Sequence, residues 1–234
     1  MSTSGVAVPY ASRDEEKTRL KQAWDVFQKY SPSQGWATFI LLAAALAIVG
    51  DSVTAASWVD TPGLQMVLFL SAFTAVLLSK SRLPWYLLMP IGMAIGFLVV
   101  VWQTSSLIEG EPLADQVRML WNRLTAWWQA ATSGGISNDL LPFTLGVESL
   151  AWILGFFGSW FIFRRNNVWI AVVLMATAIL TNLSFLPDRY ASRFFLFMFF
   201  AMLLVVRMAI IQNHERWQKA GVQFSPSSGW LTMH

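Results

Sequence analysis

Six long apolar blocks, separated by polar segments, restrict the fold of this chain more than any other feature of its sequence. Each block is close to the ~20 residues with which an α-helix crosses the hydrocarbon core of a bilayer. Only 12% of the residues are charged, whereas a soluble domain carries about 25%. We therefore predict an all-α fold: a polytopic helical membrane protein with about six transmembrane helices plus an interfacial amphipathic helix. The predicted spans are residues 36–58, 63–80, 84–104, 140–163, 168–187 and 190–212.

The polar segments on either side of the apolar blocks divide the chain into three parts. Residues 1–35 form an N-terminal tail, in which apolar residues recur at helical spacing from Leu20 to Tyr30 and indicate a short amphipathic helix. Residues 36–212 form the transmembrane domain, and residues 213–234 form a C-terminal tail. Tryptophan prefers the headgroup layer of a membrane, and several tryptophans fall near the predicted span boundaries. These are Trp36, Trp58, Trp85, Trp102, Trp160 and Trp169.

Lysine and arginine residues set the predicted orientation, because the cytoplasmic segments of membrane proteins carry the excess of them. With the N-terminus in the cytoplasm, eleven of these residues lie on the cytoplasmic side and four on the other side, while Arg207 lies within a span. An even number of spans then also places the C-terminus in the cytoplasm. We therefore expect a multi-pass membrane protein with both termini in the cytoplasm. The far-side residues are Arg118, Arg123, Arg189 and Arg193.

The only long connection between spans, residues 105–139, contains an amphipathic pattern outside the membrane. Apolar residues repeat there at helical spacing with polar residues opposite, and Pro112 and Gly134 mark the two ends of the pattern. The pattern predicts a helix lying flat in the membrane interface on the external face. This helix either packs onto the transmembrane bundle, which we favour because an amphipathic stripe alone specifies no ligand, or is a docking surface for a partner or lipid. The stripe consists of Leu113, Val117, Leu120, Trp121, Leu124, Trp127 and Trp128.

Ionisable side chains inside spans are costly in a bilayer and usually face the interior of the helix bundle. Asp51, Glu148, Asn182 and Arg193 are expected at similar depth in the outer half of the membrane, where they would form one intramembrane polar cluster. Such a cluster either ties helices together or provides a path for protons or ions. We favour the first role because no broken-helix or repeat pattern accompanies the cluster. Arg207 is expected to extend its guanidinium to the cytoplasmic surface.

Small residues mark two faces for close helix packing. Gly92 and Gly96 stand four residues apart on the third span, a spacing with which a neighbouring helix can approach closely, although the pattern does not identify that helix. On the fourth span, small residues lie within about 60° of Glu148 on a helical wheel. We therefore expect Glu148 to point into the bundle. The small residues are Ala151, Gly155 and Ser159.

Several kinds of functional site have no support among these residues. The sequence has no cysteine, and its two histidines, His214 and His234, follow the last apolar block, which excludes thiolate sites and a membrane-embedded histidine site. We find no phosphate-binding loop, dinucleotide motif or serine–histidine–acid arrangement. The basic residues stand in short clusters between apolar blocks, which argues against a nucleic-acid partner. We therefore predict no catalytic residues, no metal site and no cofactor, with membrane lipid and other membrane-protein subunits as partners.

Short segments outside the apolar blocks carry a resemblance to a known family. They are residues 55–60, 81–85, 133–143 and 215–217, with Gly221 and Val222. They resemble the N-terminal multi-span membrane domain of bacterial transglutaminase-like membrane proteins, and the resemblance covers nearly the whole chain. The resemblance implies a location in a bacterial cytoplasmic (inner) membrane. It also implies a membrane domain that precedes an extracytoplasmic catalytic domain with a Cys–His–Asp triad. Because this sequence has no cysteine, the family's activity does not transfer, and the chain is either a piece of such a protein or a stand-alone relative.

Three functional classes remain open. We favour a non-catalytic membrane anchor or scaffold that acts through protein–protein contacts. The first alternative is an accessory subunit of a large bacterial membrane complex, respiratory or photosynthetic, in which phenylalanines of the sixth span would contact other subunits, pigments or lipid. The second alternative is a small transporter or channel subunit that uses the polar cluster. The phenylalanines are Phe194, Phe195, Phe197, Phe199 and Phe200.

Overall fold

The structure is a computed structural model in which residues 18, 34–59, 61, 63–108, 112–135, 137–186 and 191–219 are described. Every regular element within these residues is an α-helix, so the all-α prediction is confirmed there. Of the predicted N-terminal amphipathic helix only Thr18 is described, and it is helical; the rest of that prediction lies outside the described residues. The helices are α2 (Trp36–Ala56), α3 (Leu64–Ser79), α4 (Trp85–Ser105), α5 (Leu113–Ser133), α6 (Leu141–Arg165), α7 (Val168–Leu183) and α8 (Ala191–Lys219).

Six of these helices follow the predicted spans. Four of them, α2, α4, α6 and the part of α8 from Ala191 to His214, are long and apolar enough to cross a membrane, while α3 and α7 are shorter apolar helices of 16 residues each. Their bounds agree with the prediction to within a few residues, except that α8 continues to Lys219, past the predicted end at residue 212. The end of an apolar block does not stop a helix when the polar residues that follow it favour helix, as Gln, Glu, Arg and Lys do.

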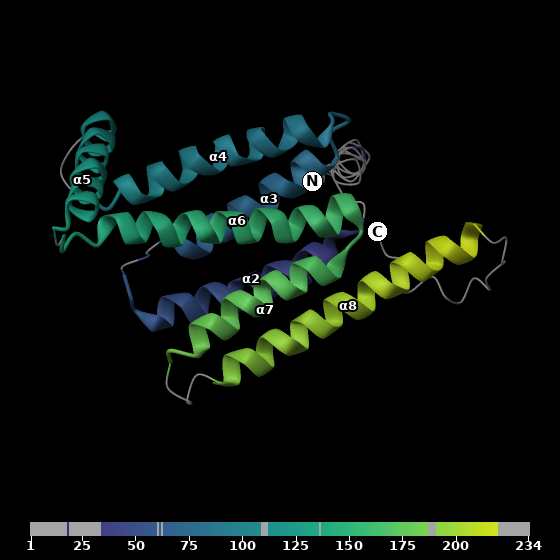
Figure 1. Cartoon of the computed structure of the whole chain (residues 1–234). Helices are drawn as coiled ribbons and strands as arrows, with labels where there is room; N and C mark the ends of the chain where they lie inside the picture. Colours follow the sequence, from purple (N-terminus) through teal and green to yellow (C-terminus); the bar gives the residue numbers. More distant parts are fainter. Residues whose placement is uncertain are drawn as a thin grey trace, which may run out of the picture.

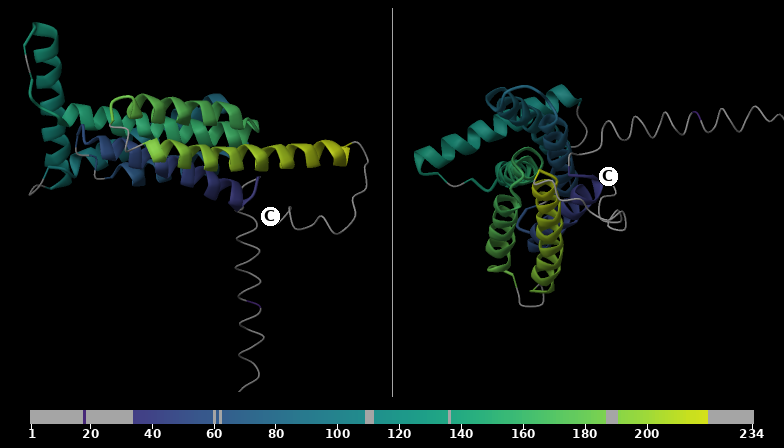
Figure 2. Two further views of the ribbon diagram at one scale, coloured as in Figure 1. Left: turned by 90° about the horizontal axis from the view of Figure 1, so that it is seen from below. Right: turned by 90° about the vertical axis from the view of Figure 1, so that its right-hand side faces the viewer.

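The six apolar helices lie side by side and alternate in direction (Figure 1). α2, α4 and α7 start at one end of the bundle, and α3, α6 and α8 finish at that same end. α5 lies across the other end, crosswise to the apolar helices, and projects to one side of them (Figure 2). We call these two ends the opposite end and the α5 end. When the bundle axis follows the membrane normal, α5 lies in the plane of the membrane interface, as its amphipathic pattern predicts.

α6 is the central helix of the bundle and contacts α3, α4 and α7. Its aromatic side chains fill the core, where Phe156 and Trp160 stack on each other and are almost fully buried. The prediction that Trp160 lies in the headgroup layer is therefore wrong, because its ring packs inward with the Arg164 guanidinium over it. Trp36 is half-buried. The remaining tryptophans at predicted boundaries are exposed: Trp58, Trp85, Trp102 and Trp169.

Large apolar side chains cover the outward faces of the bundle, as lipid or protein neighbours require. On α8, Phe195 and Phe199 are exposed, and Phe194 and Phe200 are half-buried. Phe197 is fully buried, so the prediction that it faces lipid or other subunits is wrong. Two residues along a helix correspond to a rotation of about 200°. Because Phe195 and Phe199 face outward, Phe197, two residues from each, faces into the bundle.

Candidate functional site

Three residues of the predicted polar cluster lie toward the α5 end, where α2, α7 and α8 pack together, and they form two separate contacts. Arg193 Nε donates to Asp51 Oδ2 at 2.6 Å, and the Asn182 side-chain amide donates to the carbonyl and hydroxyl oxygens of Ser52 at 2.6 and 2.7 Å. Asn182 and Ser52 are buried, whereas the Asp51 side chain is 60% exposed. A solvent-exposed ion pair contributes little stability alone, so the buried amide is the stronger link between the helices.

Glu148 lies apart from these three residues, on the side of α6 that faces α4. It is fully buried, and the Thr104 hydroxyl donates to its Oε2 at 2.8 Å. No protein donor among the described residues reaches its other oxygen, Oε1. The prediction of one four-residue cluster is therefore wrong, because a similar depth in the membrane does not determine toward which neighbour a side chain of α6 points.

Two glycines of α4 admit large rings from α6. A Cβ on Gly92 would lie 2.3 Å from the Phe156 ring, and a Cβ on Gly96 would lie 2.2 Å from the Trp152 ring. The Trp152 indole N–H also donates to the Gly92 carbonyl oxygen at 3.3 Å. The helix that approaches the Gly92–Gly96 pair, which the sequence left open, is thus α6.

The small-residue face of α6 lies against α3. A Cβ on Gly155 would lie 2.0 Å from the Ser71 hydroxyl oxygen and 3.0 Å from the Leu68 carbonyl oxygen, so a larger residue would force the two helices apart. Ala151 and Ser159, one turn away on either side, are buried as well. α6 therefore uses two adjacent faces, a small one for α3 and an aromatic one for α4.

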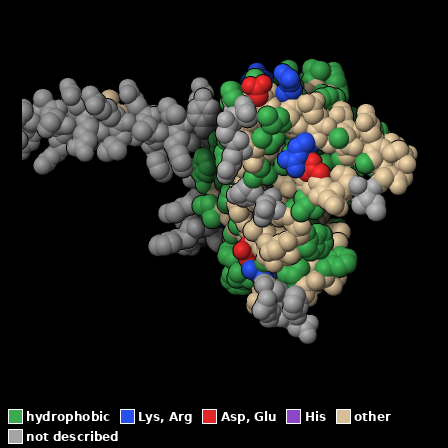
Figure 3. All heavy atoms as spheres, turned by 90° about the vertical axis from the view of Figure 1, so that its left-hand side faces the viewer, with side chains coloured by type: hydrophobic (Ala, Val, Ile, Leu, Met, Phe, Trp, Pro, Cys, Tyr) green, Lys and Arg blue, Asp and Glu red, His purple; other side chains and the backbone are tan. Residues whose placement is uncertain are grey.

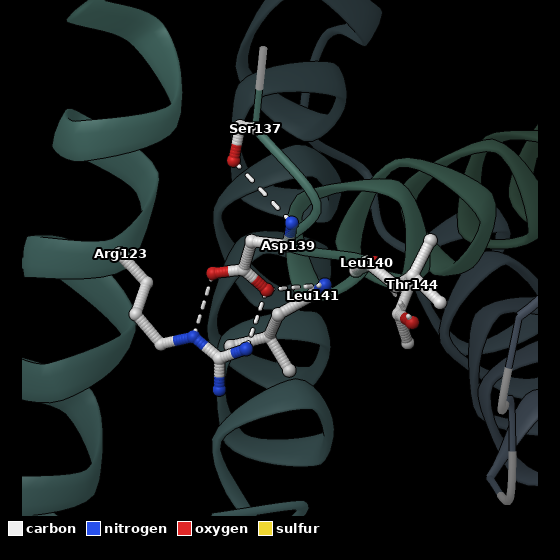
Figure 4. A network of polar contacts seen from close by, with 6 residues as sticks. All are labelled: Arg123, Ser137, Asp139, Leu140, Leu141 and Thr144. Carbon is white, nitrogen blue, oxygen red and sulfur yellow. Dashed lines mark hydrogen bonds and ion pairs between the residues drawn. The ribbon is translucent and has the colours of Figure 1, made fainter. Parts of the chain in front are cut away.

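Polar contacts fix α5 to the start of α6 (Figure 4). Arg123 and Asp139 form an ion pair in which Nε donates to Oδ2 at 2.7 Å, and Asp139 Oδ1 also accepts the backbone N–H of Leu141 at 3.0 Å. The hydrogen bond from Arg123 is the main reason that the pKa of Asp139 lies below its ordinary value. From the sequence, Arg123 entered only the count of far-side charges, since nothing in the local pattern pairs it with a residue beyond the end of its own helix.

The centre of the α5 stripe is covered by the bundle. Leu120 is 5% exposed, and Leu124 and Trp127 are half-buried. The Trp127 ring meets Phe143 of α6 in an edge-on contact. For these residues, the predicted packing of the amphipathic helix onto the bundle describes the structure.

The remaining stripe residues, in contrast, face away from the bundle. Trp121 and Trp128 are 63% and 64% exposed, and Leu113 and Val117 are exposed too. The space-filling view of the α5 end shows hydrophobic side chains at many points and few charged ones (Figure 3). Packing on the bundle, the role favoured from the sequence, thus leaves a tryptophan-rich edge of α5 exposed.

At the opposite end of the bundle, Arg164 joins α6 to the end of α3. Its guanidinium donates to the carbonyl oxygens of Ser79, Ser81 and Leu83 at 2.9, 2.8 and 3.1 Å. These contacts satisfy carbonyl groups that the last turn of a helix and the following loop leave without a helical donor. In the sequence Arg164 appeared only as a cytoplasmic charge, because a contact to a helix more than eighty residues away has no local signature.

Arg207 reaches the same end of the bundle. Its Nε donates to the hydroxyl of Thr38, in the first turn of α2, at 2.9 Å, and Thr38 in turn donates to the Gln34 carbonyl oxygen at 2.7 Å. The guanidinium therefore lies level with the start of α2, where the sequence predicts the cytoplasmic boundary of the membrane.

The described residues contain no group of three or more His, Asp or Glu side chains that is arranged to hold a metal ion. The chain matches no protein-family model, no curated protein and no solved structure. Two features of the chain itself therefore define the candidate sites: the exposed tryptophan edge of α5 and the buried carboxyl group of Glu148.

Proposed function

We propose that this chain is a non-catalytic membrane anchor or scaffold that holds an extracytoplasmic protein domain through α5. The exposed tryptophans of α5 are the observation that carries the proposal, since Trp121 and Trp128 stand two turns apart along one edge of the helix. Tryptophan and arginine dominate the binding energy of protein interfaces, and Arg118 is exposed on the same helix. Leu120 and the Arg123–Asp139 pair hold α5 in place, so a partner binds it without first ordering the helix.

The resemblance to transglutaminase-like membrane proteins supports the same function, because in that family a multi-span domain precedes an extracytoplasmic domain. The proposal includes a location in a bacterial cytoplasmic (inner) membrane with both termini in the cytoplasm. The distribution of lysine and arginine supports this orientation. In this orientation α5 lies on the extracytoplasmic face of the membrane.

A second candidate, an accessory subunit of a large respiratory or photosynthetic complex, is favoured by the surface of α8. This helix packs mainly against α2 and α7, and its outward face exposes Phe195, Phe199 and Met202. A neighbouring subunit would bury this face. The transporter alternative has less support, because it depended on Glu148 joining Asp51, Asn182 and Arg193 in one path.

Photo-crosslinking in native membranes tests the scaffold proposal. A photoreactive amino acid in place of Trp121 should form an adduct with an extracytoplasmic protein domain, because this side chain faces away from the bundle. The same amino acid in place of Asn122, which is exposed on the polar side of α5, is the matched control and should form no such adduct. Adducts with lipid alone at position 121 would contradict the proposal and define α5 as a membrane-surface helix.

The paired variant Trp121→Ala/Trp128→Ala should lose the crosslinked partner and keep the fold, since both rings are exposed. Asn122→Ala/Gln129→Ala should keep both partner and fold. Circular dichroism and the thermal stability of the protein in detergent monitor the fold. Partner loss that occurs only together with unfolding would show that the two tryptophans serve the structure and not the docking of a partner.

A further inference from the structure

Glu148 is the one ionisable side chain among the described residues that is fully buried. It lies seven residues after Leu141, the first residue of α6, which corresponds to a depth of about 11 Å from the α5 end. A buried carboxylate costs several kcal/mol unless a cation or several donors compensate it. An ionisable group buried at such a position in a membrane protein is therefore a candidate functional residue.

No cation compensates Glu148 within the described residues. The ion pairs found there are Arg123–Asp139 and Arg193–Asp51, and neither includes Glu148. α3 and α7 carry no ionisable side chain along their helical residues. The single hydrogen bond from Thr104 leaves the second carboxyl oxygen without a donor. The other ionisable groups on α6 and on the helices packed against it are Asp51 on α2, Tyr86 on α4, Asp115, Arg118 and Arg123 on α5, and Arg164 and Arg165 on α6.

Two further buried oxygen atoms have no protein donor among the described residues, and both belong to helix starts at the α5 end. They are Oε1 of Gln65, at the start of α3, and Oε1 of Gln116, in the first turn of α5. The amide groups of these two glutamines donate to the carbonyl oxygens of Ala47 and Ile108, which leaves each side-chain oxygen as an acceptor. Buried acceptors of this kind are generally satisfied by water. The α5 end is therefore the side of Glu148 on which buried polar acceptors occur.

On the side of Glu148 that faces away from α5, aromatic rings fill the core. Trp152, Phe156 and Trp160 follow Glu148 along α6 at intervals of four residues and are 2%, 0% and 1% exposed. The first two press against Gly96 and Gly92 of α4, so little space remains between the helices there. Protein interiors packed in this way exclude water. A proton on Glu148 has a polar route toward α5 and a dry, apolar one toward the opposite end.

We propose that Glu148 is a proton-binding site that exchanges with the α5 side of the membrane only. The carboxylate takes a proton from a hydronium ion on that side, which becomes water, and the neutral acid later returns the proton to water on the same side. In each direction one O–H bond forms as another breaks. The Thr104 hydroxyl can hydrogen-bond to Glu148 in both protonation states, because it donates to the carboxylate and can accept from the neutral acid. The site is independent of the scaffold function, since it lies on the α4 face of α6 and shares no residue with the tryptophan edge of α5.

Infrared difference spectroscopy of the whole protein in lipid nanodiscs tests the site, because a protonated carboxyl group has its own C=O stretch. Wild-type protein with isotope-labelled glutamate should show a band that grows as the pH falls and that shifts in deuterated water. Glu148→Gln should lack this band, and Thr104→Val should shift it by removing the hydrogen bond. Asp115→Asn is the matched control, a carboxyl group of α5 with no contact to Glu148, and should leave the band unchanged.

A glutamate band of constant intensity throughout the pH range in which the protein stays folded would overturn the proposal. So would a pH-dependent band that is insensitive to deuterated water, or one that persists in Glu148→Gln. Vesicles with uniform protein orientation test the direction of access: a pH step on the α5 side should change the band, and a step on the opposite side should not. A response to the opposite side contradicts one-sided exchange, and a response to Na⁺ at constant pH would assign the site to a metal cation.

Discussion

The contact between α4 and α6 depends on single residues that have no side chain. Gly92 and Gly96 leave room for the Phe156 and Trp152 rings, and a methyl group at either position would overlap an aromatic ring of the core. Rings enclosed on all sides cannot move without shifting their own neighbours, which is why overpacking a core is destabilising. The two glycines therefore set the distance between α4 and α6.

Gly92→Ala should lower the stability of the detergent-solubilised protein by about 1–3 kcal/mol, because its new methyl group would lie 2.3 Å from Phe156. Thermal unfolding followed by circular dichroism measures the change. Gly146→Ala on α6 is the matched control, since a Cβ there meets no atom within 4 Å, and it should leave the stability unchanged or raise it slightly. If both variants lose stability equally, the effect comes from the glycine backbone and not from the α4–α6 contact.

For single residues, the sequence predicts which way a side chain faces better than which residues it contacts. Helical periodicity places Glu148 on the inward face of α6, and it is fully buried. Its partner Thr104 does not follow from periodicity, because the rotation of α6 against α4 is set by how rings and glycines fit together. The contacts of Arg164 with the end of α3 were missed for the same reason, since they depend on which helix ends lie side by side.

α5 differs from the other helices in how it is held. The apolar helices pack against one another along the bundle, whereas α5 crosses one end of it and depends on a few contacts, chiefly Leu120 and the Arg123–Asp139 pair. Its bounds were well predicted, because amphipathic spacing, Pro112 and Gly134 are all local signals. Which part of its stripe meets the bundle was not predicted, because that depends on where α5 crosses α4 and α6.

Acidification should loosen α5. Arg123 holds the pKa of Asp139 below its ordinary value, so their pair contributes its full stabilisation above the ordinary aspartate range and loses it as the pH falls through the lowered pKa. Hydrogen exchange of the α5 amides, corrected for its intrinsic pH dependence, should therefore accelerate below that range. Asp139→Asn should accelerate exchange already at neutral pH and abolish the dependence, whereas Asp115→Asn should preserve it. An Asp139→Asn protein with wild-type exchange in α5 would show that the ion pair does not hold this helix.

For the whole molecule, the alternation of the six apolar helices agrees with the charge count made from the sequence. α2 starts and α8 ends at the same end of the bundle, and α5 lies at the other end (Figure 1). The number and order of the apolar helices follow from hydropathy alone, because each of them is a continuous apolar block. Their arrangement around α6 does not, because lipid-facing and core-facing surfaces are both apolar in a membrane protein, and hydropathy cannot tell them apart.

Labelling of single cysteines tests this orientation, since the sequence has no cysteine of its own. Ser133→Cys, which is exposed at the end of α5, should react with a membrane-impermeant maleimide in intact cells. Gln218→Cys should react only after the membrane is permeabilised, because the basic residues predict that the end of α8 is cytoplasmic. Ser133 is preferable to Gly134, whose φ of 77° disfavours any larger residue. The reverse pattern would invert the topology, and reaction of both sites in intact cells would exclude the odd number of spans predicted between Ser133 and Gln218.

The two short helices give the molecule an uneven height. α3 and α7 have 16 residues each, or about 24 Å at 1.5 Å per residue, whereas the hydrocarbon core of a bilayer is about 30 Å thick. α7 exposes Trp169 and Val173 on its outward face, so lipid chains beside it must shorten to match it. Such a mismatch costs a fraction of a kcal/mol per Å, which is enough to distribute a protein unequally between membranes of different thickness. One flank of this protein therefore prefers a thin bilayer.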